Sequence, residues 1–120
     1  RELPEEYTHI QLSGTLRRRI DQAYAQLRTT TYYEFLGVAP DADREQIREA
    51  YFALAKIFHP DTQFRRELGD YKHKMEAVFG RLTRAYDVLS KRRLRAAYNE
   101  HLQALAAAGY SVYASLPTVR

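Results

Sequence analysis

The sequence contains no cysteine and little glycine or proline: its 120 residues include 5 glycines and 4 prolines. Without cysteine, the chain can form neither disulfide bonds nor thiolate metal sites. The absence of cysteine is compatible with a reducing compartment, and we expect a cytoplasmic protein. Because so few residues favour turns, most of the chain can form long regular elements.

Long apolar runs are missing as well. No stretch approaches the roughly 20 apolar residues that span a bilayer, so we expect no membrane insertion. No secretory signal pattern opens the chain. The first residue is Arg1 rather than Met, so we expect a fragment whose partners include other domains of a longer protein.

The composition that remains is that of one ordinary globular domain, with 45% hydrophobic and 28% charged residues. The formal net charge of +4 favours an acidic partner. Nucleic acid, an anionic membrane and an acidic protein surface would all fit, and charge alone does not choose among them.

Two helices are predicted before the first proline-containing loop. Apolar residues recur at helical spacing over about residues 13–28, which predicts an amphipathic helix. Threonines 29–31 then favour a break, because three adjacent β-branched side chains are poorly accommodated in a helix. A very short apolar helix is predicted at 32–36, ending at Gly37.

A longer helix is predicted from Asp43. Its carboxylate can accept from free amide groups at the helix start, and Gln46 three residues later completes a capping box. The apolar stripe of this helix is Ile47, Ala50, Tyr51, Leu54 and Phe58. Pro60 ends the helix, because proline disfavours the α conformation at the residue before it.

Two further helices are predicted after a loop over 61–70. One covers 71–89, and Ser90 is expected to cap a final helix that ends near Gly109. Since no alternating strand occurs, we predict an all-α fold. Two long antiparallel amphipathic helices are joined by a loop, braced by short helices, and preceded by an additional N-terminal helix. The expected divisions are an N-terminal extension at 1–30, a helical domain at 31–108 and a tail at 109–120.

Four local features follow one another in a fixed order. They are YYEFLGV (32–38), IREAY (47–51), His59-Pro60-Asp61, and AYDVLS (85–90) with RAAY (95–98). Together they resemble the J-domain of DnaJ-type co-chaperones across about residues 31–100. The resemblance implies the J-domain fold, in which the tripeptide forms the loop between the two long helices.

The resemblance also implies a function. J-domains bind a DnaK-type (heat-shock-70 class) chaperone and stimulate its ATP hydrolysis, so the chain would be no enzyme and would need no cofactor. Partner contacts in the family come from the tripeptide and from the exposed basic face of the preceding helix. Carried over by position, the chaperone-binding residues are His59, Pro60, Asp61, Arg48, Tyr51 and Lys56.

The chemistry of the tripeptide fits a docking loop. The imidazole of His59 is tunable around neutral pH, and Pro60 fixes the local backbone. Asp61 presents a carboxylate that can pair with a partner arginine. The alternative interpretation is a plain helix stop with solvated side chains. Tyr51 also lies on the apolar stripe, so a core role is as open for it as an interface role.

The chain departs from the family pattern on the face of the helix before the tripeptide. Glu45 and Glu49 make that face nearly neutral, and Phe52, Ala53 and Ile57 form a second apolar strip. We expect the helix at 13–28 to pack on the domain, and we hypothesise that it covers this strip. If it also shaded Arg48 and Lys56, it would be autoinhibitory.

A second departure follows Ser90, where basic residues replace the common Asp-Pro. Lys91, Arg92, Arg93 and Arg95 form a candidate auxiliary contact for an acidic partner; the alternative is a solvated basic face. Asn99 replaces a frequent aspartate, so any contact of that carboxylate is expected to be lost.

Two other functions stay open at this point. One is a degenerate J-like interaction domain without chaperone activation, favoured by the neutral helix face. The other is a basic nucleic-acid-binding domain, for which one basic cluster without a recognition helix is thin support. The four histidines lack metal-ligand spacing, and no nucleophile with a base or glycine-rich phosphate loop occurs, so we expect neither a metal site nor a catalytic site.

Overall fold

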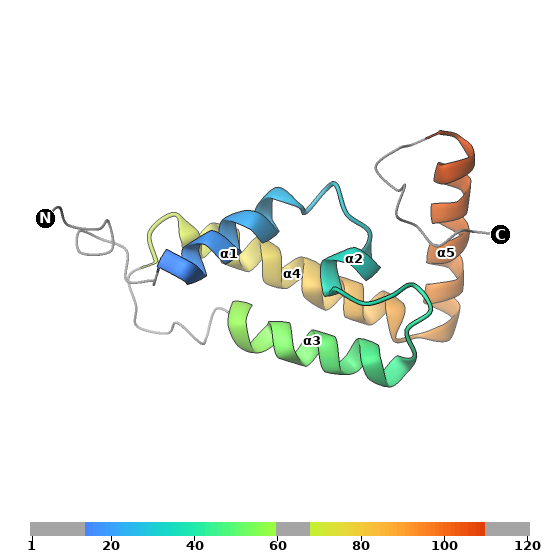
Figure 1. Ribbon diagram of the computed structural model, residues 1–120, viewed down its shortest axis with the longest axis horizontal. Coiled ribbons are helices and arrows are strands. Elements are labelled where there is room, and N and C mark those ends of the chain that lie inside the picture. Colours follow the sequence, from blue (N-terminus) through green and yellow to red (C-terminus); the bar gives the residue numbers. More distant parts are fainter. Residues whose placement is uncertain (1–13, 60–67, 110–120) are drawn as a thin grey trace, which may run out of the picture.

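Five helices follow one another in the computed structural model, which describes residues 14–59 and 68–109. They are α1 (Gly14–Ala25), α2 (Tyr32–Leu36), α3 (Arg44–Phe58), α4 (Tyr71–Leu89) and α5 (Arg92–Ala107). No strand occurs in these two ranges, and the predicted all-α fold is confirmed. Figure 1 shows α3 and α4 running antiparallel, α1 and α2 along α4, and α5 across its C-terminal end. The predicted loop at 61–70 and the tail at 109–120 lie mostly outside the described residues.

Helices α2 and α3 each begin with a capping box. In α3, Asp43 Oδ1 accepts from the Gln46 amide at 2.8 Å and Gln46 Oε1 accepts from the Asp43 amide at 2.9 Å, which confirms the predicted box. In α2, Thr31 and Glu34 form a second box. Threonines 29–31 are predicted only as a break, although the spacing of Thr31 and Glu34 carries the same capping-box signature. Gly37 closes α2 with a left-handed φ of 75°.

The predicted cap of α5 is wrong. Ser90 has the helical backbone angles φ −86° and ψ −9° and ends α4, whereas an N-cap residue takes an extended conformation. Lys91 occupies the N-cap position and provides no side-chain cap hydrogen bond. The C-terminal end of α5 agrees with expectation, because Gly109 adopts a φ of 90° just after it.

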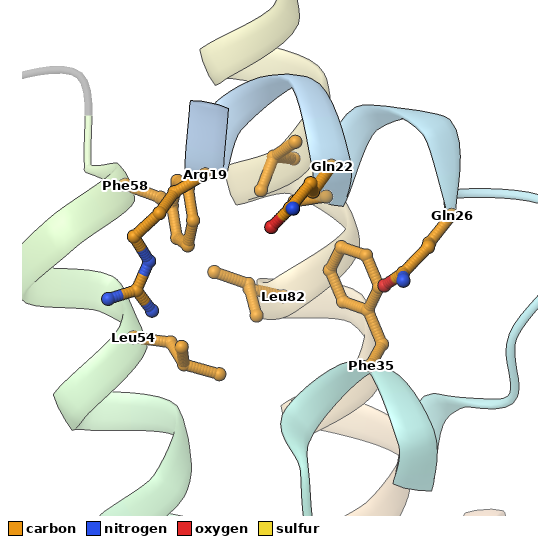
Figure 2. A pocket seen from close by; sticks show the side chains of 9 residues that line it. Arg19, Gln22, Gln26, Phe35, Leu54, Phe58 and Leu82 are labelled. Atoms are coloured by element: carbon orange, nitrogen blue, oxygen red, sulfur yellow. The ribbon is translucent and has the colours of Figure 1, made fainter. Parts of the chain in front are cut away.

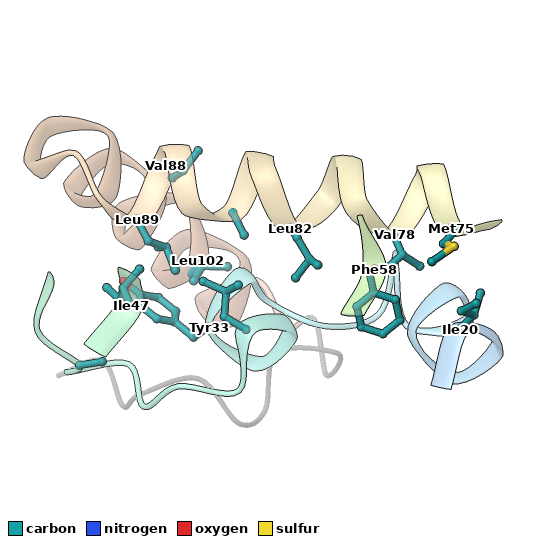
Figure 3. Packing of buried hydrophobic residues seen from close by; sticks show 13 residues of the cluster. Ile20, Tyr33, Ile47, Phe58, Met75, Val78, Leu82, Val88, Leu89 and Leu102 are labelled. Carbon is teal, nitrogen blue, oxygen red and sulfur yellow. The ribbon is translucent and has the colours of Figure 1, made fainter. Parts of the chain in front are cut away.

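The core is one cluster to which all five helices contribute (Figure 3). Six of its residues come from α4 alone: Met75, Val78, Leu82, Ala85, Val88 and Leu89. Ile20 of α1 is fully buried, and Figure 3 places it near Met75 and Val78 at one end of α4. The expectation that the N-terminal helix packs on the domain is therefore confirmed.

A polar contact fixes α1 to α4. Lys74 Nζ donates to Asp21 Oδ1 and the Tyr71 hydroxyl donates to Asp21 Oδ2, both at 2.8 Å. The hydrogen bond from Lys74 holds the pKa of Asp21 below its usual 3.8. Burial and the hydrogen bond to Asp21 raise the pKa of Tyr71.

Arg95 ties the loop between α2 and α3 to α5. One terminal nitrogen donates to the carbonyl oxygens of Pro40 and Ala42 at 2.9 and 2.8 Å. Its Nε donates to the hydroxyl of the buried Tyr33 at 3.1 Å, and that hydroxyl donates to Asn99. The planar guanidinium of arginine has several N–H donors in fixed directions and can satisfy these acceptors together. The single ammonium group of lysine cannot.

We predict that Arg95→Lys lowers the free energy of unfolding by about 1–3 kcal/mol, because the loop carbonyls and the Tyr33 hydroxyl lose charge-assisted donors. Urea unfolding followed by circular dichroism measures the change. Arg93→Lys on the exposed face of the same helix serves as the matched control and should change stability by less than about 0.5 kcal/mol. Equal effects of the two variants would contradict the proposed tie.

We predict that Asp21→Asn lowers the free energy of unfolding by less than about 1 kcal/mol near neutral pH, since the ion pair between Asp21 and Lys74 is partly exposed. Because the folded-state pKa of Asp21 is depressed, the contribution is fully present above the ordinary aspartate pKa. It is lost as the pH falls through the lowered pKa. Unfolding curves of both proteins from pH 7 downward measure this difference, which should disappear in strong acid. A difference that is constant with pH would contradict the assignment.

Candidate functional site

His59 lies at the C-terminal end of α3, directly opposite the first half of α4. Its backbone amide donates to the Ala55 carbonyl at 2.9 Å, and its φ of −65° and ψ of 127° leave the helix in the extended conformation expected before a proline. The imidazole packs on Phe79 of α4 with ring centroids 4.5 Å apart and planes at 54°. The tripeptide's other two residues, Pro60 and Asp61, lie outside the described residues.

The helix end that presents His59 is held from two sides. Phe58 is only 4% exposed and belongs to the core. The guanidinium of Arg19 in α1 lies 5.9 Å from the Phe58 ring centre. Neither the contact of His59 with Phe79 nor that of Phe58 with Arg19 is predicted from the sequence, although Phe79 falls on the apolar face of the predicted helix at 71–89. Periodicity indicates which face is buried but not which residue meets His59.

The basic residues predicted on α3 are exposed and accompany an aromatic side chain. Arg48, Phe52 and Lys56 follow at intervals of four residues and therefore share one side of the helix. Phe52 is 47% exposed. Arg48 lies 3.5 Å from Glu45 Oε2, and its guanidinium carbon lies 5.2 Å from the Phe52 ring centre. The charge of Arg48 is thus partly offset, as the nearly neutral face in the sequence suggests.

Tyr51 joins α3 to α4. Its ring stacks on Tyr86 with centroids 4.5 Å apart and planes at 9°, and its hydroxyl lies 3.4 Å from Thr83 Oγ1. The Phe52 ring packs edge-on against Tyr51 with ring centroids 5.2 Å apart, and its centroid lies 6.1 Å from that of Tyr86 with the planes tilted at 56°. Tyr51 is half-buried, so it packs between the helices and still reaches the surface.

The hypothesis that the N-terminal helix covers the apolar strip is wrong for Phe52 and Ala53, which are exposed. Ile57 is half-buried and packs against the core. The contact of Asp21 with Lys74 explains this, because it fixes α1 along α4. Arg48 and Lys56 are also exposed, so α1 does not shade them.

In the candidate auxiliary basic cluster, Arg95 and Lys91 have partners within the fold, whereas Arg92 and Arg93 take no part in these contacts. Arg95 is wrongly assigned as an external contact, since its donors are engaged with the loop carbonyls and Tyr33. Lys91 pairs with Asp87, and this hydrogen bond holds the pKa of Asp87 below its usual value. Arg92 and Arg93 are exposed.

Asn99 has a partner within the fold. Its Oδ1 accepts the hydrogen bond of the Tyr33 hydroxyl. In the two described ranges, no group of three metal-ligating side chains comes together. Nor is any helix within them long and apolar enough to cross a membrane.

Comparison with known proteins matches the region that carries these features. A family model described as the DnaJ domain matches residues 31–99. A chaperone protein DnaJ of Trichormus variabilis is 47% identical over 68 residues, which are 57% of this chain and 16% of that protein. No solved structure gives a significant match.

Two eukaryotic proteins are also similar to this chain. Human DnaJ homolog subfamily C member 4 is 38% identical over 76 residues, covering 63% of this chain and 29% of that protein. A tetratricopeptide repeat and J domain-containing co-chaperone of Fusarium oxysporum is 40% identical over 77 residues, covering 64% of this chain and 14% of that protein. The chain therefore spans less than a third of the length of each of these relatives, and helix α1 precedes the region that the family model matches.

Proposed function

The chain belongs to the DnaJ-domain family, and from that premise we propose that it is a co-chaperone module that binds a DnaK-type chaperone and stimulates its ATP hydrolysis. The stimulating element is the tripeptide His59-Pro60-Asp61. The module is not itself an enzyme, because the hydrolysis takes place on the partner. It acts within a longer protein whose other parts select clients and location, for which the cytoplasm stays the prediction.

The position of His59 is the observation that carries this proposal. It lies midway through the matched region, at the end of a helix that is capped at its start and anchored by Phe58 at its finish. Its ring is positioned by Phe79, so little conformational entropy is lost when a partner docks against it. A proline directly after it lowers that entropy cost further.

The docking surface continues from His59 along α3 through Lys56, Phe52 and Arg48. We infer a contact that is more apolar than ionic, because Phe52 is exposed at its centre and Arg48 already interacts with Glu45. Tyr51 supports this surface from the side through its stack on Tyr86.

The neutral surface also favours one competing function, a J-like interaction domain that binds a protein without activating a chaperone. Nucleic-acid binding has less support than the sequence suggested. Two of the four basic residues in the auxiliary cluster, Lys91 and Arg95, already have partners within the fold.

We predict that His59→Gln abolishes stimulation of ATP hydrolysis by a DnaK-type chaperone while the domain stays folded. Glutamine keeps a polar side chain but loses the imidazole that packs on Phe79. Single-turnover hydrolysis of ATP prebound to the chaperone measures the rate with and without the domain. His101→Gln, at an exposed position of α5, is the matched control and should stimulate like the wild type.

The outcomes of this measurement separate the competing functions. Stimulation by the wild type and by His101→Gln, but not by His59→Gln, supports the proposal. Binding to the chaperone without stimulation would contradict it and indicate the degenerate module. A salt-sensitive complex with RNA or DNA in the absence of any chaperone effect would indicate the basic nucleic-acid-binding domain.

We predict that stimulation depends on Phe52 and only weakly on salt. Raising the ionic strength from about 0.01 to 0.1 M shortens the screening length from about 30 to 10 Å, which weakens steering between charged surfaces. If the contact is apolar, the wild-type domain should keep most of its stimulation of ATP hydrolysis at the higher ionic strength. Phe52→Ser should lower the stimulation at both ionic strengths. Gln103→Ser on α5 controls for a surface serine. A steep salt dependence that Phe52→Ser leaves unchanged would contradict the apolar contact.

A further inference from the structure

A hollow of about 170 Å³ lies where α1 crosses the space between α2, α3 and α4 (Figure 2). Its lining residues are Arg19, Gln22, Ala23, Gln26, Phe35, Leu54, Phe58, Val78 and Leu82. Because α1 precedes the region matched by the family model, this hollow depends on a part of the chain outside the matched domain.

The hollow has an apolar floor and a polar rim. Figure 2 shows Leu54, Leu82 and Phe35 below α1, with Arg19 reaching down toward Leu54, Gln22 above Leu82 and Gln26 beside Phe35. Arg19, Gln22 and Gln26 follow at intervals of three and four residues, so they share one side of the helix. Seven residues of α-helix place the ends of this row roughly 10 Å apart.

The size of the hollow limits what can enter it. A cavity of about 150 Å³ lined by aliphatic and aromatic side chains holds one benzene molecule. Sites for larger organic ligands measure about 300–1,000 Å³. The hollow therefore accepts one branched aliphatic or aromatic group, such as a single side chain of a longer polypeptide.

The polar side chains of the rim indicate which polar groups the ligand carries beside that apolar group. Among the described residues, no carboxylate forms an ion pair with Arg19, and its guanidinium carbon lies 5.9 Å from the Phe58 ring centre. The carboxamides of Gln22 and Gln26 each offer both a donor and an acceptor. An extended peptide advances about 3.3 Å per residue, so three residues match the row, with backbone groups facing the glutamines and a carboxylate facing Arg19.

We propose that this hollow binds an extended acidic segment of a partner protein, in which an aspartate or glutamate lies two positions from an apolar residue, so that both side chains point to the same side of the segment. The apolar side chain enters between Phe35, Leu54 and Leu82. The carboxylate pairs with Arg19, and the peptide backbone bonds to Gln22 and Gln26. This site is separate from the outer surface of α3 and goes beyond the proposed function, although its Phe58 is the residue before His59.

The test uses the full chain labelled with ¹⁵N and the probe acetyl-Leu-Gly-Asp-Gly-amide at millimolar concentrations. Backbone amide shifts should change saturably at residues that line the hollow, above all those of α1 and Phe35. A probe with Lys in place of Asp and one with Ser in place of Leu serve as matched ligands, and both should bind more weakly.

Two protein variants complete the test. Arg19→Gln should weaken binding of the aspartyl probe about tenfold, as expected for a lost charge-assisted pair. Arg18→Gln, one residue away and outside the lining, should bind like the wild type. The double variant Gln22→Ala and Gln26→Ala should also weaken binding, and it keeps α1 folded because alanine favours helix.

The site would be overturned by the absence of saturable shifts in the wild type. It would equally be overturned if the lysyl or seryl probe bound as tightly as the aspartyl probe, or if Arg19→Gln bound like Arg18→Gln. Because none of these measurements involves a chaperone or ATP, the result is independent of whether the domain stimulates hydrolysis.

Discussion

The continuous apolar face of α4 sets where the other helices pack. Each of the other four helices packs against α4, and six of the buried core residues lie on it. The N-terminal half of this face receives Ile20 and Phe58, and the C-terminal half receives Ile47 and Leu102 (Figure 3). Since burial of apolar area is the main driving force of folding, α1 and α5 are parts of the same cooperative core.

Directional polar contacts decide how the helices sit on that central face. Asp21 bonds to Lys74 and Tyr71 at the start of α4, and Arg95 bonds to the loop carbonyls near its end. Arg81 donates to the Thr30 carbonyl between these points. Apolar packing alone tolerates sliding and rotation, whereas hydrogen bonds require defined geometry. These contacts therefore fix α1, α2 and α5 in one arrangement around the pair that presents His59.

The arrangement leaves two different surfaces on either side of the end of α3. The outer side offers Arg48, Phe52 and Lys56, with modest charge and an exposed ring. The other side faces α1 and forms the hollow beneath Arg19 and its two glutamines. Phe58 lies between them and directly before His59, so both surfaces are supported by the same buried ring. Helix α1, which precedes the region that the family model matches, contributes the polar rim of this hollow.

The helices could be predicted from the order of residues along the chain, because apolar periodicity, the Asp43 capping box and proline act over a few residues. The sequence also indicated the family, through motifs local to the chain. It could not place Arg95, which is indistinguishable in sequence from Arg92 and Arg93 yet reaches carbonyls more than fifty positions away. The same limit applies to Phe79 beside His59, to the exposed strip that α1 does not cover, and to the hollow beneath α1. These contacts and surfaces depend on the three-dimensional packing, because the partner of a side chain depends on how the helices meet. Helical periodicity indicates which face of a helix is buried but not which residues lie opposite that face.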